Sequence, residues 1–240
     1  MRAQRGVLVT KWKRVARGLW VGEYTNGSNV IHTSVVDMGD GSLMAISPGT
    51  GMSDADFDEL DALGPVKALV SPGAFHHLGM PSWKARYPDA PLFGPQSSIA
   101  HIKKQQPGLE AVQGFDALRP LLSDEFDLGE VDACRHPDIF LALTRDGQTS
   151  WFTNELLTNN ADWPSSFVFR WVFKLTGNAP GLQANTLTAM FIGAKKPLVK
   201  AFYEAKVKSC PPTRLMPCHG DVLEDDTLGE RIVEVLGRRF

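Results

Sequence analysis

The chain has 240 residues, of which 43% are hydrophobic and 22% are charged, and its formal net charge is −2. This is the composition of an ordinary globular protein with enough apolar residues for a sizeable core, and it gives no general reason to expect nucleic acid as a partner. No run approaches the ~18–20 apolar residues that span a bilayer, and the three cysteines form no CxxC pair, which favours a reducing, cytoplasmic environment over a disulfide framework.

Residues 1–17 form a basic N-terminal segment, because six Lys and Arg residues precede the first acid, Glu23. A solvated basic surface is the first interpretation, and an arm that binds an anionic polymer is the alternative. No apolar stretch follows these charges, so we expect no signal peptide. Residues 18–240 are expected to form a single domain.

The first half of that domain predicts strands followed by helices. A strand over 18–22 precedes a hairpin, 30–37 with 42–47, whose Gly39-Asp40-Gly41 turn supplies positive-φ positions. Ser53 and Asp56 resemble a capping box at the start of a helix over 54–63. A buried strand over 66–71 then ends at Pro72-Gly73.

Further elements are predicted along the rest of the chain. They are helices over 80–87, 96–105, 197–209 and 223–239, and strands over 90–93, 125–128, 131–134, 139–144, 149–153 and 215–217. With no internal repeat and no linker, the pattern predicts a mixed α/β fold.

The segment Trp163–Leu175 stands apart because, from Phe167 onward, only Arg170 and Lys174 interrupt its apolar residues. A helix that is apolar over most of its surface is expected to be buried. Packing in the core or in a homodimer is the first interpretation, and a lid over a hydrophobic substrate pocket is the alternative.

Five polar residues lie just past predicted strands. His76 and His77 are on the loop after 66–71, and His136, Glu155 and His219 each stand near a strand end. Taken singly, each could equally be a hydrogen-bonded turn residue. Together, four histidines and a carboxylate are a donor set that suits Zn²⁺ or iron.

The order and context of these residues resemble the metallo-β-lactamase fold superfamily, from about Leu19 onward. That family's H-x-H-x-D-H loop follows a strand ending in Thr or Ser, and its ligand positions fall here on Pro72, Ala74, His76 and His77. Two of the family's histidines are therefore missing and His76 replaces its aspartate.

The later family motifs are also altered in this chain. His136 stands nineteen residues before Glu155, in place of a T-P-G-H-T-like turn, and Phe152 to Glu155 resembles the family's T-G-D strand end. Cys218-His219-Gly220 matches its late G-H-G signature. The resemblance implies a four-layer αββα sandwich of a divergent branch.

The resemblance also implies a function. It suggests a single divalent metal ion, zinc in preference to iron, with ligands among His76, His77, His136, Glu155 and His219. Attack by metal-bound hydroxide on a small ester, thioester, lactone or amide would follow, with Asp221 or Asp138 as base or orienter. The alternative is a catalytically inactive domain of this fold that binds a ligand or partner.

Overall fold

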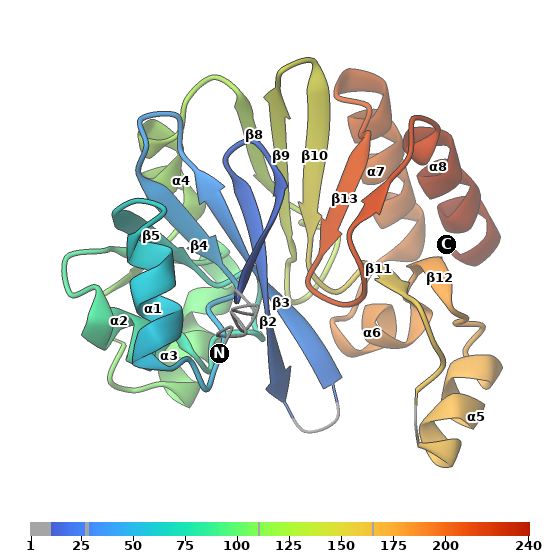
Figure 1. The fold of residues 1–240 in the computed structure, drawn as a ribbon. Coiled ribbons are helices and arrows are strands. Elements are labelled where there is room, and N and C mark those ends of the chain that lie inside the picture. The colour runs from blue at the N-terminus through green and yellow to red at the C-terminus, as the bar shows by residue number, and fades with distance from the viewer. Residues whose placement is uncertain (1–10, 27–28, 110, 165) are drawn as a thin grey trace, which may run out of the picture.

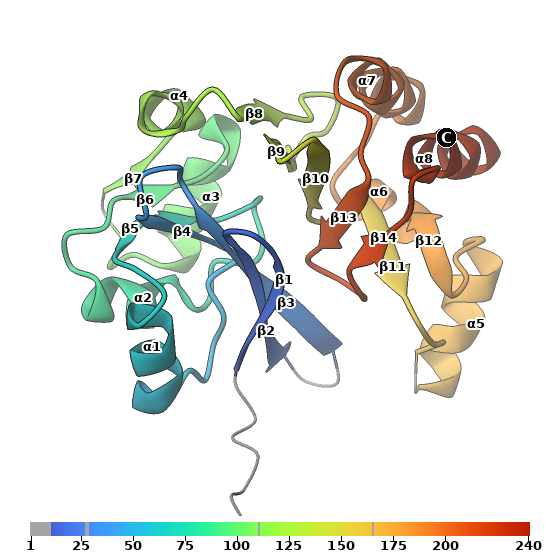
Figure 2. The ribbon, with the colours of Figure 1, turned by 45° about the horizontal axis from the view of Figure 1, so that its top comes forward.

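Two β-sheets face each other in the computed structural model, which describes residues 11–26, 29–109, 111–164 and 166–240 (Figure 1). Helices cover the outer side of each sheet, so the order of layers is helix, sheet, sheet, helix (Figure 2). This arrangement confirms the predicted four-layer αββα sandwich.

The first sheet has its strands side by side in chain order. They are β1 (Trp12–Ala16), β2 (Leu19–Asn26), β3 (Asn29–Asp37), β4 (Leu43–Ile46), β5 (Val66–Val70), β6 (Leu92–Phe93) and β7 (Val112–Gln113). The first four are antiparallel, and β4 to β7 run parallel to one another.

The second sheet has the order β14-β13-β10-β9-β8. Its strands are β8 (Phe126–Glu130), β9 (Ile139–Arg145), β10 (Gln148–Thr153), β13 (Arg214–Pro217) and β14 (Leu223–Glu224). Only β10 and β13 are parallel in this sheet. A separate antiparallel pair consists of β11 (Leu157–Asn160) and β12 (Gly181–Ala184).

The helices lie mostly outside the sheets. On the first sheet are α1 (Asp54–Asp61), α2 (Met80–Arg86), α3 (Ile99–Gln105) and α4 (Phe115–Leu118); the second half adds α5 (Phe167–Leu175), α6 (Thr186–Phe191), α7 (Lys196–Ser209) and α8 (Leu228–Arg239).

The capping box of α1 is confirmed, because the Asp56 amide donates to Ser53 Oγ and the Ser53 amide donates to Asp56.

Consecutive strand residues face opposite sides of each sheet, as the period-2 geometry of a strand requires. On β3, Val36 packs between the sheets, whereas Val35 packs under the helices of the first sheet. On β10, Phe152 faces the other sheet and Trp151 faces α7 and α8. Strands such as β9 and β10 are therefore buried on both faces over most of their length, which explains their continuous apolar runs.

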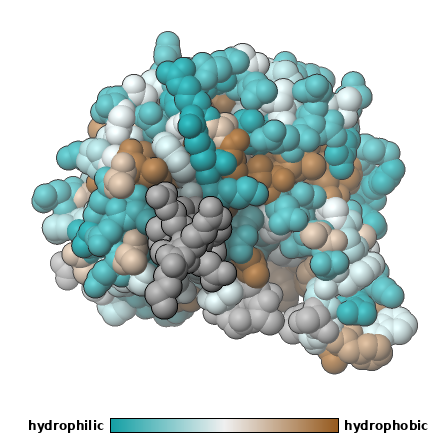
Figure 3. All heavy atoms as spheres, viewed as in Figure 1, coloured by the Kyte–Doolittle hydropathy of each residue, from teal (hydrophilic) through white to brown (hydrophobic). Residues whose placement is uncertain are grey.

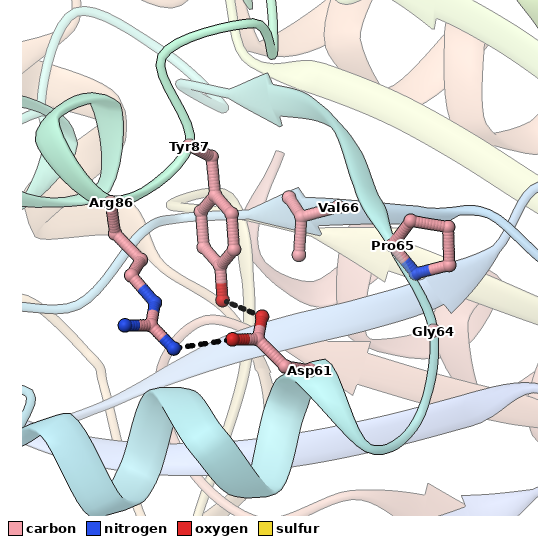
Figure 4. A pocket seen from close by; sticks show the side chains of 6 residues that line it. All are labelled: Asp61, Gly64, Pro65, Val66, Arg86 and Tyr87. Atoms are coloured by element: carbon pink, nitrogen blue, oxygen red, sulfur yellow. Dashed lines mark hydrogen bonds and ion pairs between the residues drawn. The ribbon is translucent and has the colours of Figure 1, made fainter.

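An ion-pair cluster joins α1 to α2 on the outer side of the first sheet, beside a surface pocket (Figure 4). Asp61 accepts hydrogen bonds from Tyr87, at 2.9 Å, and from Arg86, which also pairs with Asp58. The carboxylates are already paired with groups of the chain itself, so this pocket is explained by helix packing.

Several predicted elements are corrected by the structure. Residues 131–134 form a turn instead of a strand, and α8 begins at Leu228 because Leu223 and Glu224 pair as β14. Within the basic segment 1–17, residues 12–16 form β1 and pair with β2, so the segment is part of the sheet from Trp12 onward.

The expectation that Trp163–Leu175 is buried in the core is wrong. Helix α5 projects beyond both sheets, and its Phe167 and Leu175 side chains are 71% and 81% exposed (Figures 1 and 2). Among the described residues no helix is both long and apolar enough to cross a membrane.

Candidate metal centre

His76 lies on the loop that follows β5, and the loop is tied down by its own first residues. Ser71 Oγ donates to the carbonyls of Gly73 and Phe75, at 2.9 and 3.2 Å, and Pro72 O accepts from the Ile139 amide. Pro72 and Ala74 carry no donor side chain, so the loop offers histidines only at 76 and 77.

The His76 ring is held through its Nδ1 atom by two hydroxyl groups from the first sheet. Tyr24 OH and Ser47 Oγ lie 3.2 and 3.3 Å from Nδ1, and 3.0 Å from each other. When Nδ1 carries the proton, these hydroxyl oxygens can accept a hydrogen bond from it, and the lone pair of Nε2 can then bind a metal ion. The Nε2 atom is the one that faces Glu155, 3.0 Å from Oε1.

Glu155 and His219 reach the site because β10 and β13 are parallel and in register. Thr153 and Pro217 are paired, and Glu155 and His219 each stand two residues further on. The carboxyl ends of neighbouring parallel strands meet at one edge of a sheet, so these two side chains arrive together.

Asp138 holds the backbone of Glu155 in place. Its carboxylate accepts from the amides of Glu155 and Leu156, at 2.8 and 3.1 Å, and from the Asn154 side chain at 2.9 Å. Burial, together with the Glu155 charge, raises the pKa of Asp138 to about 7. Because Asp138 is buried and hydrogen-bonded to the backbone of this turn, it positions Glu155 and does not face the open side of the site.

Three donor groups converge at this edge: His76, Glu155 and His219. The two Nε2 atoms of His76 and His219 are 3.1 Å apart, and His219 Nε2 is 3.7 Å from Glu155 Oε2. Burial works to raise the pKa of Glu155, but the hydrogen bonds of His219 and His76 outweigh it and hold that pKa well below its usual range. Glu155 is therefore an anion between two imidazoles.

Access to this group is narrow. The side chains of His76 and Glu155 are 5% and 11% exposed, whereas that of His219 is 23% exposed. The open side of the site is therefore the side on which His219 lies.

Solved structures with the same arrangement of layers are metallo-β-lactamases. The chain matches FIM-1 from Pseudomonas aeruginosa, in its mono-zinc form, with a TM-score of 0.59 at 13% identity over 95% of this chain and 94% of that one. It matches the metallo-β-lactamase from Pontibacter korlensis with a TM-score of 0.58 at 12% identity, over 94% and 98% of the two chains. For the enzyme from Erythrobacter litoralis the score is 0.58 at 12% identity, over 95% and 92%.

The protein has the metallo-β-lactamase fold. The fold that the resemblance implied is confirmed, at identities of 12–13%. No family model and no curated protein matches the sequence.

Of the five predicted ligands of this metallo-β-lactamase-fold protein, the structure brings three together. His77 and His136 lie outside that group of donor atoms. Both face His101 instead, with ring centroids 6.3 and 5.7 Å from the His101 ring. The Nδ1 atom of His77 is buried without a hydrogen-bond partner.

Asp221, the other predicted base or orienter, is exposed at the start of the segment after His219. Its backbone is fixed by Asn159, whose carbonyl accepts from the Asp221 amide at 2.7 Å. Asp221 is therefore exposed to solvent, whereas Asp138 is enclosed.

Sequence reasoning did not find Tyr24, Ser47 or His101. Ser47 directly follows β4, which is parallel to β5, so the rule that parallel strands end at one edge was a usable signal. His101 lies on α3, and the centroid of its ring is 6.1 Å from that of Phe75 on the histidine loop. Tyr24 had no comparable signal, because it comes from an antiparallel strand.

Proposed function

We propose that this protein is a metal-dependent hydrolase with one metal ion, held by His76, Glu155 and His219. The observation that carries the proposal is the convergence of these three donor atoms, all within 4.8 Å of one another, from three separate segments. Two of those segments come from the second sheet and one comes from the first.

The residues present fit a zinc ion. Two imidazoles and one carboxylate form a ligand set of catalytic zinc sites, which keep a fourth position open. Bonds of ~2.0–2.1 Å in a tetrahedron place ligand atoms roughly 3.3 Å apart. The 3.1 Å between the two Nε2 atoms and the 3.0 Å between His76 and Glu155 are close to that spacing.

A zinc ion so bound would polarise a substrate carbonyl and lower the pKa of water at the open position. The chain's own residues would serve this chemistry by orientation. Tyr24 and Ser47 fix the His76 ring, and Asp138 fixes Glu155 through its backbone. We assign Asp221, exposed beside His219, as the group that takes up or returns protons.

We propose a small ester, thioester, lactone or amide as the substrate. The low exposure of His76 and Glu155 restricts approach to the side of His219, which suits a small acyl group better than a polymer chain. His77, His101 and His136 are a neighbouring group outside the three ligands, and we assign them to the surroundings of the metal centre.

Metal content on protein without a histidine tag tests the proposal. After loading with zinc and removal of free metal, we expect about one zinc ion per chain in the wild type, measured by inductively coupled plasma mass spectrometry. Glu155→Ala and His219→Ala should each lose the ion, because two ligands do not hold zinc tightly. The substituted proteins are also assayed against a panel of aryl esters and thioesters.

The matched control is His101→Ala, which removes an imidazole near the site but outside the three ligands. It should keep the ion. Wild-type protein that takes up no zinc and no iron would contradict the proposal and support a catalytically inactive binding domain of the same fold.

A further inference from the structure

Exposed hydrophobic side chains gather on one part of the second half of the chain. Seven of the eleven large hydrophobic residues that are exposed in the described part of the chain lie between residues 167 and 198. We call these seven the apolar surface: Phe167, Val168, Trp171, Leu175, Met190, Phe191 and Leu198. Such a concentration marks an interaction site, because exposed apolar residues on soluble proteins are usually scattered.

Helix α5 presents the largest part of this surface. Phe167, Trp171 and Leu175 recur every four residues and so share one face of the helix. The helix stands clear of both sheets (Figures 1 and 2), and its projecting end at the lower right of Figure 3 shows hydrophobic atoms beside pale and hydrophilic ones. This face has no partner within the described part of the chain.

A hydrogen bond between buried polar groups joins the segment after α5 to the start of α6. The Thr186 amide, at the start of α6, donates to the Asn178 side chain just beyond α5, at 3.2 Å. Met190 and Phe191 lie at the far end of α6, next to Ile192, whose carbonyl accepts from the His136 amide. The end of α6 is therefore attached to His136, one of the histidines outside the three proposed ligands.

The charges of this region have one sign. Residues 163–203 contain no Asp or Glu, although the whole chain has 27 acidic residues and a net charge of −2. Their charged residues are Arg170, Lys174, Lys195, Lys196 and Lys200, of which Lys200 is paired with Glu204 just beyond the segment, at 3.9 Å. The Lys174 Nζ atom lies 5.3 and 5.8 Å from the ring centroids of Trp163 and Trp171, so its stem runs along the aromatic face.

Two occupants of the surface can be compared by charge. In a symmetric dimer the same patch meets itself, which would bring the cations of α5 together with no acid of the segment to pair them. An anionic lipid surface offers apolar chains to Phe167 and Trp171 and phosphate groups to Arg170 and Lys174. Apolar and aromatic side chains flanked by basic ones are the composition of helices that lie in a membrane interface.

We propose that the apolar surface binds the headgroup region of a bilayer that contains anionic lipid, with α5 lying in the plane of the interface. This binding does not depend on the proposed hydrolase activity. It would bring the mouth of the candidate metal centre next to the lipid, because α6 contacts His136.

Sedimentation with vesicles tests the proposal on the full-length protein. We expect binding to vesicles of phosphatidylcholine mixed with phosphatidylglycerol, weaker binding to phosphatidylcholine alone, and release by high salt. Phe167→Ser with Trp171→Ser should weaken binding roughly tenfold or more, because both side chains leave water in the bound state. Arg170→Gln with Lys174→Gln should weaken it roughly fivefold for each cation removed.

Two control variants lie outside the apolar surface. Leu121→Ser removes a side chain that is 48% exposed, and Lys103→Gln with Lys104→Gln removes two exposed cations of α3. Both should bind vesicles as the wild type does. No sedimentation with anionic vesicles, or equal binding by all variants, would overturn the proposal. A wild-type dimer that becomes a monomer in the Phe167→Ser, Trp171→Ser variant would overturn it in favour of a second copy.

Discussion

His76 is central to the geometry of the site, because both nitrogens of its ring have partners in the chain. Its φ is +60°, and Ser47, which contacts it, has a φ of +57°. Left-handed backbone is uncommon for residues other than glycine and is concentrated at functional sites. The backbone at these two positions turns the His76 ring inward, toward Glu155.

Removing the two hydroxyl groups that contact His76 Nδ1 tests whether they orient the His76 ring. Tyr24→Phe with Ser47→Ala leaves Nδ1 without its two partners, and we expect zinc affinity to fall about 10–100-fold. Competition with a coloured chelator measures the change.

Tyr203→Phe is the matched control for that experiment. Its hydroxyl group is buried without a hydrogen-bond partner, so its loss should leave zinc affinity unchanged. Equal affinity in the Tyr24→Phe, Ser47→Ala variant and the wild type would show that these hydroxyls do not orient the ligand.

The residues of the candidate site could be predicted from the sequence only in part. Glu155 and His219 follow apolar strand runs and are brought together as their positions suggested. The sequence does not determine which of two adjacent histidines points inward, because that depends on the positive φ of His76. His77 is turned toward His101 for the same reason.

At the scale of elements, the turn after β13 places His219. Gly220 has a φ of +88°, and a Cβ atom there would stand 2.1 Å from the Asn159 carbonyl oxygen of β11. The Asn159 amide in turn donates to the His219 carbonyl. The turn therefore requires glycine at this position.

Gly220→Ala should lower the free energy of unfolding by about 2–4 kcal/mol and displace His219, since both strain and a backbone clash oppose it. Urea denaturation measures the first effect and zinc content the second. Gly129→Ala, on β8, is the control, because nothing lies within 4 Å of its added Cβ. A Gly220→Ala protein as stable as this control would contradict the role of the turn.

The salt bridge between Glu125 and Arg145 joins the start of β8 to the end of β9, with 2.6 Å between Oε2 and Nη2. The Arg145 guanidinium holds the pKa of Glu125 below its usual range. Because the folded pKa is depressed, the stabilisation is complete above the unfolded pKa of about 4.3 and is lost as pH falls through the folded value.

Glu125→Gln should therefore reduce the free energy of unfolding by about 1 kcal/mol at neutral pH, a figure discounted for the partly exposed carboxylate. The difference from the wild type should vanish in acid. Urea midpoints across the pH range measure it. Glu230→Gln is the control, because Glu230 has no ion pair within the described ranges. A difference that persists below the folded pKa of Glu125 would rule out this explanation.

Among the elements, those bounded by Gly, Pro or a cap were predicted well, as the hairpin after β3 and the capped α1 show. Strand β1 was missed because Lys13 and Arg14 project into solvent and only Trp12 is fully buried. The exposure of α5 was missed because an apolar helix is expected to be covered, and the sequence does not show whether the cover is the same chain or another molecule.

At the scale of the whole molecule, the two halves of the chain each build a sheet with its own helices, and the apolar faces of the sheets meet. Alternation along the strands made this architecture predictable, since residues such as Val35 and Val36 must both be buried, on opposite faces. That the two sheets pack face to face was predicted from the family resemblance and not from the composition.

The three proposed ligands are divided between those halves: His76 belongs to the first sheet, and Glu155 and His219 belong to the second. Beside them, the His32 amide of β3 donates to the Cys218 carbonyl, so the sheets already touch there. A metal ion bound by these three ligands would therefore link the two sheets. Its binding would depend on the contact between the two halves of the chain, so loss of the ion would indicate a change in that contact as well as in the site.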